Sequence, residues 1–284
     1  MDDLYYRPSG QAPMAGIAIG VLCGGLAGAV LAFVYSYAIL YIPIVGYVTF
    51  ILSLGFGGLT GFATGLALRH GKVRSTWAAW ATGGLVAAIT FYCSWVVWIY
   101  ALFHRADVQV PLGQIFMHPS SLWTLIVEVN KVGAWTIKGS TPTGAILWIF
   151  WGSEALLILV PAVVCAALPI RDPFCEACER WCDERKAVRK SGQAAKEDLV
   201  TRIEAKDWVW VGTLGPGEAA LHLSYDLHVC PSCEEMHTLT VHDVRTVQEE
   251  GKAVNKSEAV VQHLLLTRHD AAALCAAPPA PTKP

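Results

Sequence analysis

The sequence predicts a membrane α-helical bundle of four transmembrane helices, followed by a small water-soluble α+β domain. Composition is the first reason. Hydrophobic residues make up 54% of the 284 residues and charged residues only 15%, whereas soluble proteins carry about 25% charged residues. Charge placement is the second reason, because 32 of the 44 Asp, Glu, Lys and Arg residues lie from Pro169 onward. The chain therefore divides into a membrane part and a part that lies in water.

Four apolar stretches are each longer than the ~20 residues that cross a hydrocarbon core. They extend over about residues 14–40, 44–68, 76–103 and 144–168. Together they form a predicted transmembrane domain over residues 14–168, preceded by a polar segment, residues 1–13. That segment has neither a basic leader nor a small-residue cleavage site, so we expect no cleaved signal peptide.

Small residues recur every fourth position in three of the spans. They are Gly16, Gly20, Gly24 and Gly28, then Gly57, Gly61 and Gly65, then Ala79, Gly83 and Ala87. This spacing places them on one helix face, where helix backbones can approach closely. We expect tight packing within the bundle, and the alternative is a glycine-lined seam for oligomerisation or for a pore.

Basic residues near the span ends predict the orientation. Residues 69–74 contain three of them, and residues 169–190 after the fourth span contain six, whereas the forty residues of loop 104–143 contain only three. Both termini are therefore predicted to be cytoplasmic, in a plasma membrane or in the inner membrane of a Gram-negative cell. Membrane lipids are the first expected partners.

The outer loop, residues 104–143, has a helical pattern of its own. A serine, Ser120, precedes a periodic segment that ends at Gly133, as capped helices do. Its apolar residues share one face: Leu122, Ile126, Val129 and Val132. We expect an amphipathic helix that lies on the outer membrane surface or caps the bundle.

Glu154 is the one acidic residue within the four predicted spans. An ionisable group at membrane depth is costly and marks a candidate intramembrane polar site. Two interpretations stay open. It is a structural group, protonated or bonded to a Ser, Thr or Tyr of the bundle, or it is a proton site, a cation site or a contact for a basic residue of a partner. No second acid accompanies it in the spans, which disfavours a proton relay.

Two Cys-x-x-Cys pairs, Cys175 with Cys178 and Cys230 with Cys233, stand in the water-soluble part. Four thiolates at this spacing are typical of a tetrahedral site, most often for zinc. A closed four-sulfur shell leaves no position for water or substrate, so we expect a structural ion. A reducing cytoplasm would keep these cysteines free of disulfides. Three neighbours could replace one ligand: Cys182, His228 and His237. Thioredoxin-like dithiol chemistry is a further alternative.

The predicted metal-binding domain covers residues 169–275, and an Ala/Pro-rich tail, predicted to be disordered, covers residues 276–284. A charged segment, residues 183–207, is expected to be helical in part, over 194–206. Residues 221–229 alternate between apolar and polar side chains, which predicts a strand with one buried face. Residues 238–247 and 260–267 are predicted as the next strands.

The two cysteine pairs and their flanking residues, 174–182 and 229–235, resemble the knuckles of zinc-ribbon and rubredoxin-like modules. The resemblance implies a zinc-ribbon-like sheet module held by one tetrahedral metal, and it does not extend to the membrane part. Glu179 and Glu234 follow the second cysteine of each pair, where rubredoxins have glycine, which leaves room for backbone amides to bond the sulfurs. Iron is therefore less favoured than zinc.

The function that these features favour is that of an interaction, scaffold or accessory subunit of a membrane complex, with a protein partner or a second copy of the chain. The sequence lacks Walker, H-E-x-x-H and G-x-S-x-G motifs, which favours a protein that is not an enzyme. Nucleic acid is disfavoured because residues 169–284 carry a net charge of −4, from 14 basic and 18 acidic residues. The alternatives are a small-solute or ion transporter or channel using Glu154, and a membrane-anchored redox protein with iron or dithiol chemistry.

Overall fold

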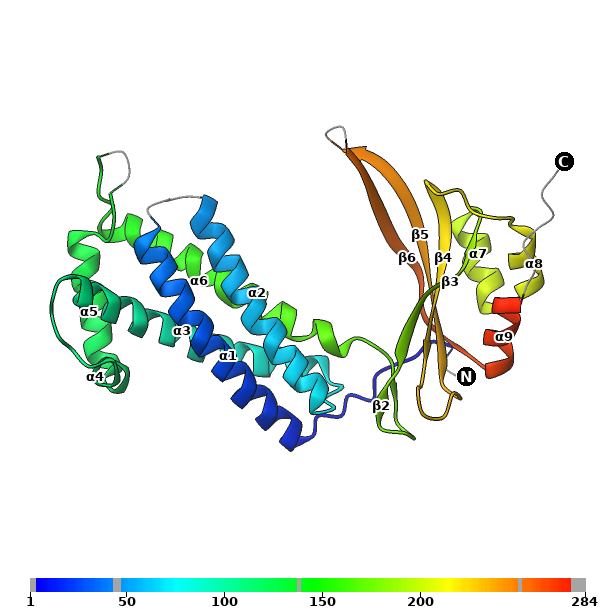
Figure 1. The fold of residues 1–284 in the computed structure, drawn as a ribbon, viewed down its shortest axis with the longest axis horizontal. Coiled ribbons are helices and arrows are strands. Elements are labelled where there is room, and N and C mark those ends of the chain that lie inside the picture. The colour runs from blue at the N-terminus through cyan, green and yellow to red at the C-terminus, as the bar shows by residue number, and fades with distance from the viewer. Residues whose placement is uncertain (1–3, 43–46, 137–138, 250–251, 277–284) are drawn as a thin grey trace. The chain divides into compact units, whose positions relative to one another are not determined.

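The structure is a computed structural model that describes residues 4–42, 47–136, 139–249 and 252–276 (Figure 1). The chain divides into two compact units. One unit comprises residues 9–171, and the other combines residues 1–8 with residues 172–284. Two predictions lie outside the described residues, namely the start of the second span at 44–46 and the tail from residue 277 onward.

The first unit is helical, and four of its helices are long and apolar enough to cross a membrane, as predicted. They are α1 (Met14–Tyr41), α2 (Tyr47–His70), α3 (Thr76–Arg105) and α6 (Gly144–Ala166). Helix α3 begins after Ser75, whose side chain accepts a hydrogen bond from the backbone N–H of Ala78 at 3.3 Å. A short 3₁₀ turn, η1 (Leu168–Ile170), follows α6. The Arg69 guanidinium at the end of α2 donates to the carbonyl of Pro169 at 2.5 Å, which ties the two helix ends together.

The glycines spaced by four residues lie where these helices touch. A Cβ atom added at Gly61 of α2 would lie 2.1 Å from the carbonyl oxygen of Ala162 in α6. A Cβ at Gly24 of α1 would lie 2.4 Å from the hydroxyl of Thr64 in α2. These contacts are closer than any side chain allows, so the glycines permit helix packing within the chain, in agreement with the packing interpretation.

Two shorter helices, α4 (Leu112–Met117) and α5 (Pro119–Val132), lie between α3 and α6 in sequence. Helix α5 caps the bundle, because its Leu122 and Ile126 join a core with residues of α3 and α6. The predicted apolar face is wrong at its end. Val132 is 74% exposed, and Asn130 is buried instead, donating to the carbonyl of Gly144 at 3.1 Å.

The second unit contains a four-stranded antiparallel sheet in the order β3-β4-β5-β6 (Figure 1). Its strands are β3 (Asp183–Ser191), β4 (Leu221–Val229), β5 (His237–Glu249) and β6 (Lys252–Leu266). Three short helices accompany the sheet: α7 (Lys196–Glu204), α8 (Trp208–Thr213) and α9 (Arg268–Ala276). A separate two-stranded ribbon pairs β1 (Phe174–Cys175) with β2 (Arg180–Trp181).

The apolar side chains of β4 face the helices, as their alternation predicts. Leu223, Tyr225 and Leu227 form one buried core with residues of β5, β6 and the three helices. The expectation of a single buried face is wrong, however, because His222, Asp226 and His228 on the opposite side of β4 are also buried. Burying these polar groups requires hydrogen-bond partners, and β3 supplies one of them, since the Ala187 N–H donates to Asp226 at 2.7 Å.

Strand β3 was not among the predicted strands, because its sequence lies in the charged segment that suggested a helix. It pairs with β4 from Asp183 opposite Val229 to Ser191 opposite Leu223, with an irregularity between Arg185 and Arg189. The predicted helix within that segment is present but shorter, as α7.

Within the predicted N-terminal segment, residues 4–8 belong to the second unit and residues 9–13 to the helical unit. Tyr5 pairs with Leu264 of β6. The N–H of Tyr6 donates to the carbonyl of His263 at 2.8 Å, and the N–H of Leu265 donates to Leu4 at 2.8 Å. These bonds cover part of the outer edge of β6, which would otherwise present unpaired backbone groups.

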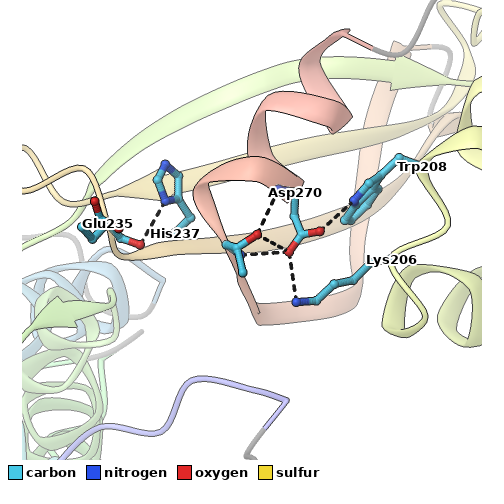
Figure 2. A network of polar contacts seen from close by, with 6 residues as sticks. Lys206, Trp208, Glu235, His237 and Asp270 are labelled. Atoms are coloured by element: carbon cyan, nitrogen blue, oxygen red, sulfur yellow. Dashed lines mark hydrogen bonds and ion pairs between the residues drawn. The ribbon is translucent and has the colours of Figure 1, made fainter.

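Helix α9 is held at its first turn by Asp270, the centre of the polar network in Figure 2. Its carboxylate accepts from the Thr267 hydroxyl at 2.7 Å and from Trp208 Nε1 at 3.4 Å, and Lys206 Nζ lies 3.0 Å away. Burial alone would raise the pKa of Asp270, but the bonds from Thr267, Lys206 and Trp208 lower it to about 2.

The predicted tail, residues 276–284, begins one residue too early, because α9 includes Ala276.

Candidate metal centre and polar cavity

The four predicted metal ligands lie together in the second unit. Their Sγ atoms all lie within 4.8 Å of one another, and those of Cys175 and Cys233 are 3.9 Å apart. The first pair is placed by the β1–β2 ribbon and the second by the connection between β4 and β5. A zinc ion with Zn–S bonds of about 2.3 Å in tetrahedral geometry requires sulfurs about 3.8 Å apart. The four cysteines therefore fit a metal ion.

Both knuckles place a glutamate in the left-handed backbone region. Glu179 has φ +49° and Glu234 has φ +52°, a conformation that favours glycine. The turn after Cys233 brings the backbone N–H groups of Glu235 and Met236 onto its sulfur, and the N–H of Cys178 bonds the sulfur of Cys175. At Cys233, therefore, a glutamate in the position of the rubredoxin glycine does not remove the amide-to-sulfur bonds, so the argument against iron does not hold for this pair.

The thiols of this group differ in pKa. The bond from the Glu235 amide, followed by one from Cys178, lowers the pKa of Cys233 to about 7. The pKa of Cys178 is raised to about 12, first because its thiol bonds to Cys233. Four thiolates at this separation repel one another, so their full ionisation needs a bound cation.

The possible substitute ligands stay outside the group of four. Cys182 is buried beside it, and burial, followed by the neighbouring cysteines, raises its pKa to about 12, so its thiol stays neutral. The His237 ring nitrogen Nδ1 lies 3.3 Å from the carbonyl of Glu235 (Figure 2). The ring of His228 packs edge-on against that of His263, with centroids 5.0 Å apart.

The histidine contacts reveal a polar cluster that the sequence did not predict. Asp226 of β4 lies 3.4 Å from Nε2 of His242 on β5, and Nδ1 of His263 on β6 lies 3.4 Å from the Thr240 hydroxyl. All are on the sheet face opposite the helices. The sequence signal that could have indicated this cluster is the alternation on β4, which places Asp226 and His228 on one face of the strand.

Glu154 bonds to the bundle in the way that its structural interpretation expects. The hydroxyl of Tyr35 in α1 donates to its carboxylate, and the Tyr35 oxygen lies 3.0 Å from the hydroxyl of Ser53 in α2. Tyr35 also stacks on Phe56, with ring centroids 4.8 Å apart. Three helices therefore meet at this carboxylate.

Glu154 also lines a cavity of about 570 Å³ within the helical unit. Its walls contain side chains from α1, α2, α3, α6 and the connection before α6, and many of them are aromatic. The two interpretations of Glu154 are thus compatible, because a carboxylate fixed by Tyr35 can still face a cavity. Tyr35 and Ser53 were not predicted, since no spacing in the sequence connects them to Glu154.

Comparison with known proteins gives no family for the chain: no protein-family model, curated protein or solved structure matches it. The functional argument therefore depends on the two sites themselves.

Proposed function

We propose that the chain is an integral membrane protein with four spans and one structural zinc ion, and that it serves as an interaction, scaffold or accessory subunit of a membrane complex. The observation that carries this proposal is the group of four sulfurs within 4.8 Å of one another. Four protein ligands complete a tetrahedral shell. Such an ion would hold the β1–β2 ribbon to the β4–β5 connection and would leave no position for a substrate.

The pairing of residues 4–6 with β6 supports an even number of membrane crossings. Because Tyr5 and Leu264 belong to one folded unit, the N-terminus and the C-terminal domain would lie in the same compartment. The basic residues after α6 favour the cytoplasm, where thiolates stay reduced. Zinc is favoured over iron because it is the usual occupant of structural four-cysteine sites.

Affinity purification in a mild detergent tests the proposed role. A scaffold or accessory subunit should be recovered with a stoichiometric protein partner or as a homo-oligomer. The Cys230→Ser variant should lose that partner if the zinc-held domain binds it, whereas the exposed Cys275→Ser variant should keep it. A wild-type chain recovered as a monomer without partners would contradict the proposal.

The cavity favours a second candidate function, a small-solute or ion transporter or channel that uses Glu154. Ionisable residues that face a cavity in a membrane bundle often mark substrate or ion pathways, and Glu154 lines such a cavity. Reconstituted liposomes should then show flux that Glu154→Gln abolishes. Absence of flux from the native protein over a panel of ions and small solutes would contradict this candidate.

A further inference from the structure

We propose that the cavity beside Glu154 is a binding site for a hydrophobic organic cation, that is, an ammonium group attached to an aliphatic or aromatic body. This goes beyond the proposed function, because binding does not require that the ligand crosses a membrane. The cavity of about 570 Å³ is large enough for a drug-sized molecule.

The cavity has chemically different ends. Ile42, Arg105 and Thr136 line it where helices end. Ser94 and Glu154 line it near the middle of their helices, and Tyr35 joins them there through its bond to Glu154. A ligand entering from the helix ends would therefore pass Arg105 first and reach the carboxylate at the inner end.

The hydroxyl groups of the inner end can accept hydrogen bonds but have no protons left to donate. Five hydroxyl groups line this part of the cavity, and each makes a hydrogen bond to another protein group. Ser36 donates to the Ser94 carbonyl at 2.8 Å, Ser53 to Thr49 at 2.9 Å, Ser94 to Phe91 at 2.7 Å, Ser153 to Phe150 at 2.7 Å, and Tyr35 to Glu154. A hydroxyl has a single proton, so these oxygens can only accept from a ligand. A ligand group that bonds to these hydroxyl oxygens must therefore be a donor.

The carboxylate and the aromatic walls together favour a positively charged donor. When it is ionised, Glu154 supplies a negative charge and only acceptor sites. Trp95 and Trp151 pack edge to face with centroids 5.0 Å apart, and Trp98 packs edge-on against Trp95 at 5.4 Å. Aromatic rings in this wall attract cations through their negatively charged faces. An anion would find its only fully charged partner, Arg105, at the far end of this lining.

The rest of the wall indicates that the ligand is organic rather than a bare ion. Ile39, Leu102 and Leu157 contribute apolar surface, which a hydrated or bare inorganic cation cannot use. The indole of Trp135 also lines the cavity and adds aromatic surface to this wall.

The test compares a cation with its neutral isostere on the full chain in phosphatidylcholine nanodiscs. Naphthylmethylamine, protonated at neutral pH, and naphthylmethanol are titrated separately while tryptophan fluorescence is recorded, with protein-free nanodiscs as the partition control. The wild type should bind the amine saturably and about tenfold or more tightly than the alcohol, as expected for a charge-assisted hydrogen bond.

Two variants locate the binding. Glu154→Gln keeps the shape but removes the charge, so the preference for the amine should disappear. Tyr92→Phe is the matched control, because the Tyr92 hydroxyl donates to the Phe116 carbonyl at 2.6 Å away from the cavity lining, and the preference should persist. Equal binding of amine and alcohol by the wild type would overturn the proposal without any variant. An amine preference that survives Glu154→Gln would overturn it as well.

Discussion

At the residue scale, Glu179 and Glu234 hold a backbone conformation that proteins usually give to glycine. A non-glycine residue in this region costs roughly 1–2 kcal/mol. Hydrogen bonds to Cys233 offset this cost, because the turn at Glu234 places the next two backbone amides on the Cys233 sulfur. Metal binding would stabilise this turn, because the amides bond the thiolate form most strongly.

The side chain at residue 234 should therefore control metal affinity through the backbone. Glu234→Val should weaken zinc binding, since a β-branched residue is strongly disfavoured at positive φ, and should cost about 1–2 kcal/mol of stability. Glu234→Gly should bind zinc as well as the wild type or better. Both variants lose the exposed ion pair with Arg268, so it cancels in the comparison. Competition with a chromophoric chelator measures the affinities, and equal affinities for Val and Gly would contradict the role of the turn.

His263 should make stability depend on pH. Burial, followed by the charge of His228, lowers the pKa of His263 to about 4, against about 6.5 when unfolded. The unfolded chain therefore binds a proton that the native chain does not, and stability falls as pH falls from about 6.5 towards 4. His263→Asn should flatten this fall, because asparagine does not titrate and tolerates the φ of +55°.

Thermal unfolding, recorded at a series of pH values at which the metal stays bound, measures this effect. His269→Asn is the matched control, since His269 is exposed at the start of α9. A pH dependence that is equal in both variants would show that His263 does not titrate as described.

At the element scale, the helical bundle depends on glycines with no room for a methyl group. Gly61→Ala should destabilise the chain by about 1–3 kcal/mol, as overpacking does, because the new Cβ would lie 2.1 Å from the carbonyl oxygen of Ala162. Gly58→Ala lies on the same helix with its nearest atom 4.0 Å away. It should be neutral or stabilising by up to about 1 kcal/mol through helix propensity. Thermal unfolding in detergent separates the two variants, and equal melting temperatures would contradict the packing account.

Elements were predictable where a local pattern controls burial. The strand β4 follows from alternation, because Leu223, Tyr225 and Leu227 all enter the core. Its neighbour β3 has mainly exposed charged residues, and only Ser191 is fully buried. It is a strand because β4 offers a backbone partner, which no property of residues 183–191 reveals.

The same distinction applies to the sites. The cysteine group was predictable because each pair is local and its spacing is characteristic. The cavity beside Glu154 combines residues from four long helices and two connections, and no spacing relates Tyr35 to Ser53 or to Glu154. Such a site requires the helix packing to be known first.

At the scale of the whole molecule, the two units differ in composition, and the proposed function places them in two environments. The helical unit has the four apolar helices, and the sheet unit includes both the N-terminal residues and the cysteine group. The account therefore requires that both termini share one side of the membrane, with the connection between α3 and α6 on the other.

Protease and labelling access should reveal this topology. Epitope tags at either terminus should become accessible only after the cytoplasmic side is opened, because an even number of spans separates them. A tag inserted at the exposed Gly113, in the connection that carries α4 and α5, should be accessible from outside intact cells. Opposite accessibility of the two termini would contradict both the four spans and the pairing of Tyr5 with Leu264.

The metal content of the full chain, purified under reducing conditions, tests the central claim most directly. The account predicts one zinc ion per chain, lost in Cys230→Ser and retained in Cys275→Ser, whose cysteine is exposed on α9. Zinc that is absent from the wild type, or that remains in Cys230→Ser, would contradict a structural site formed by the four cysteines.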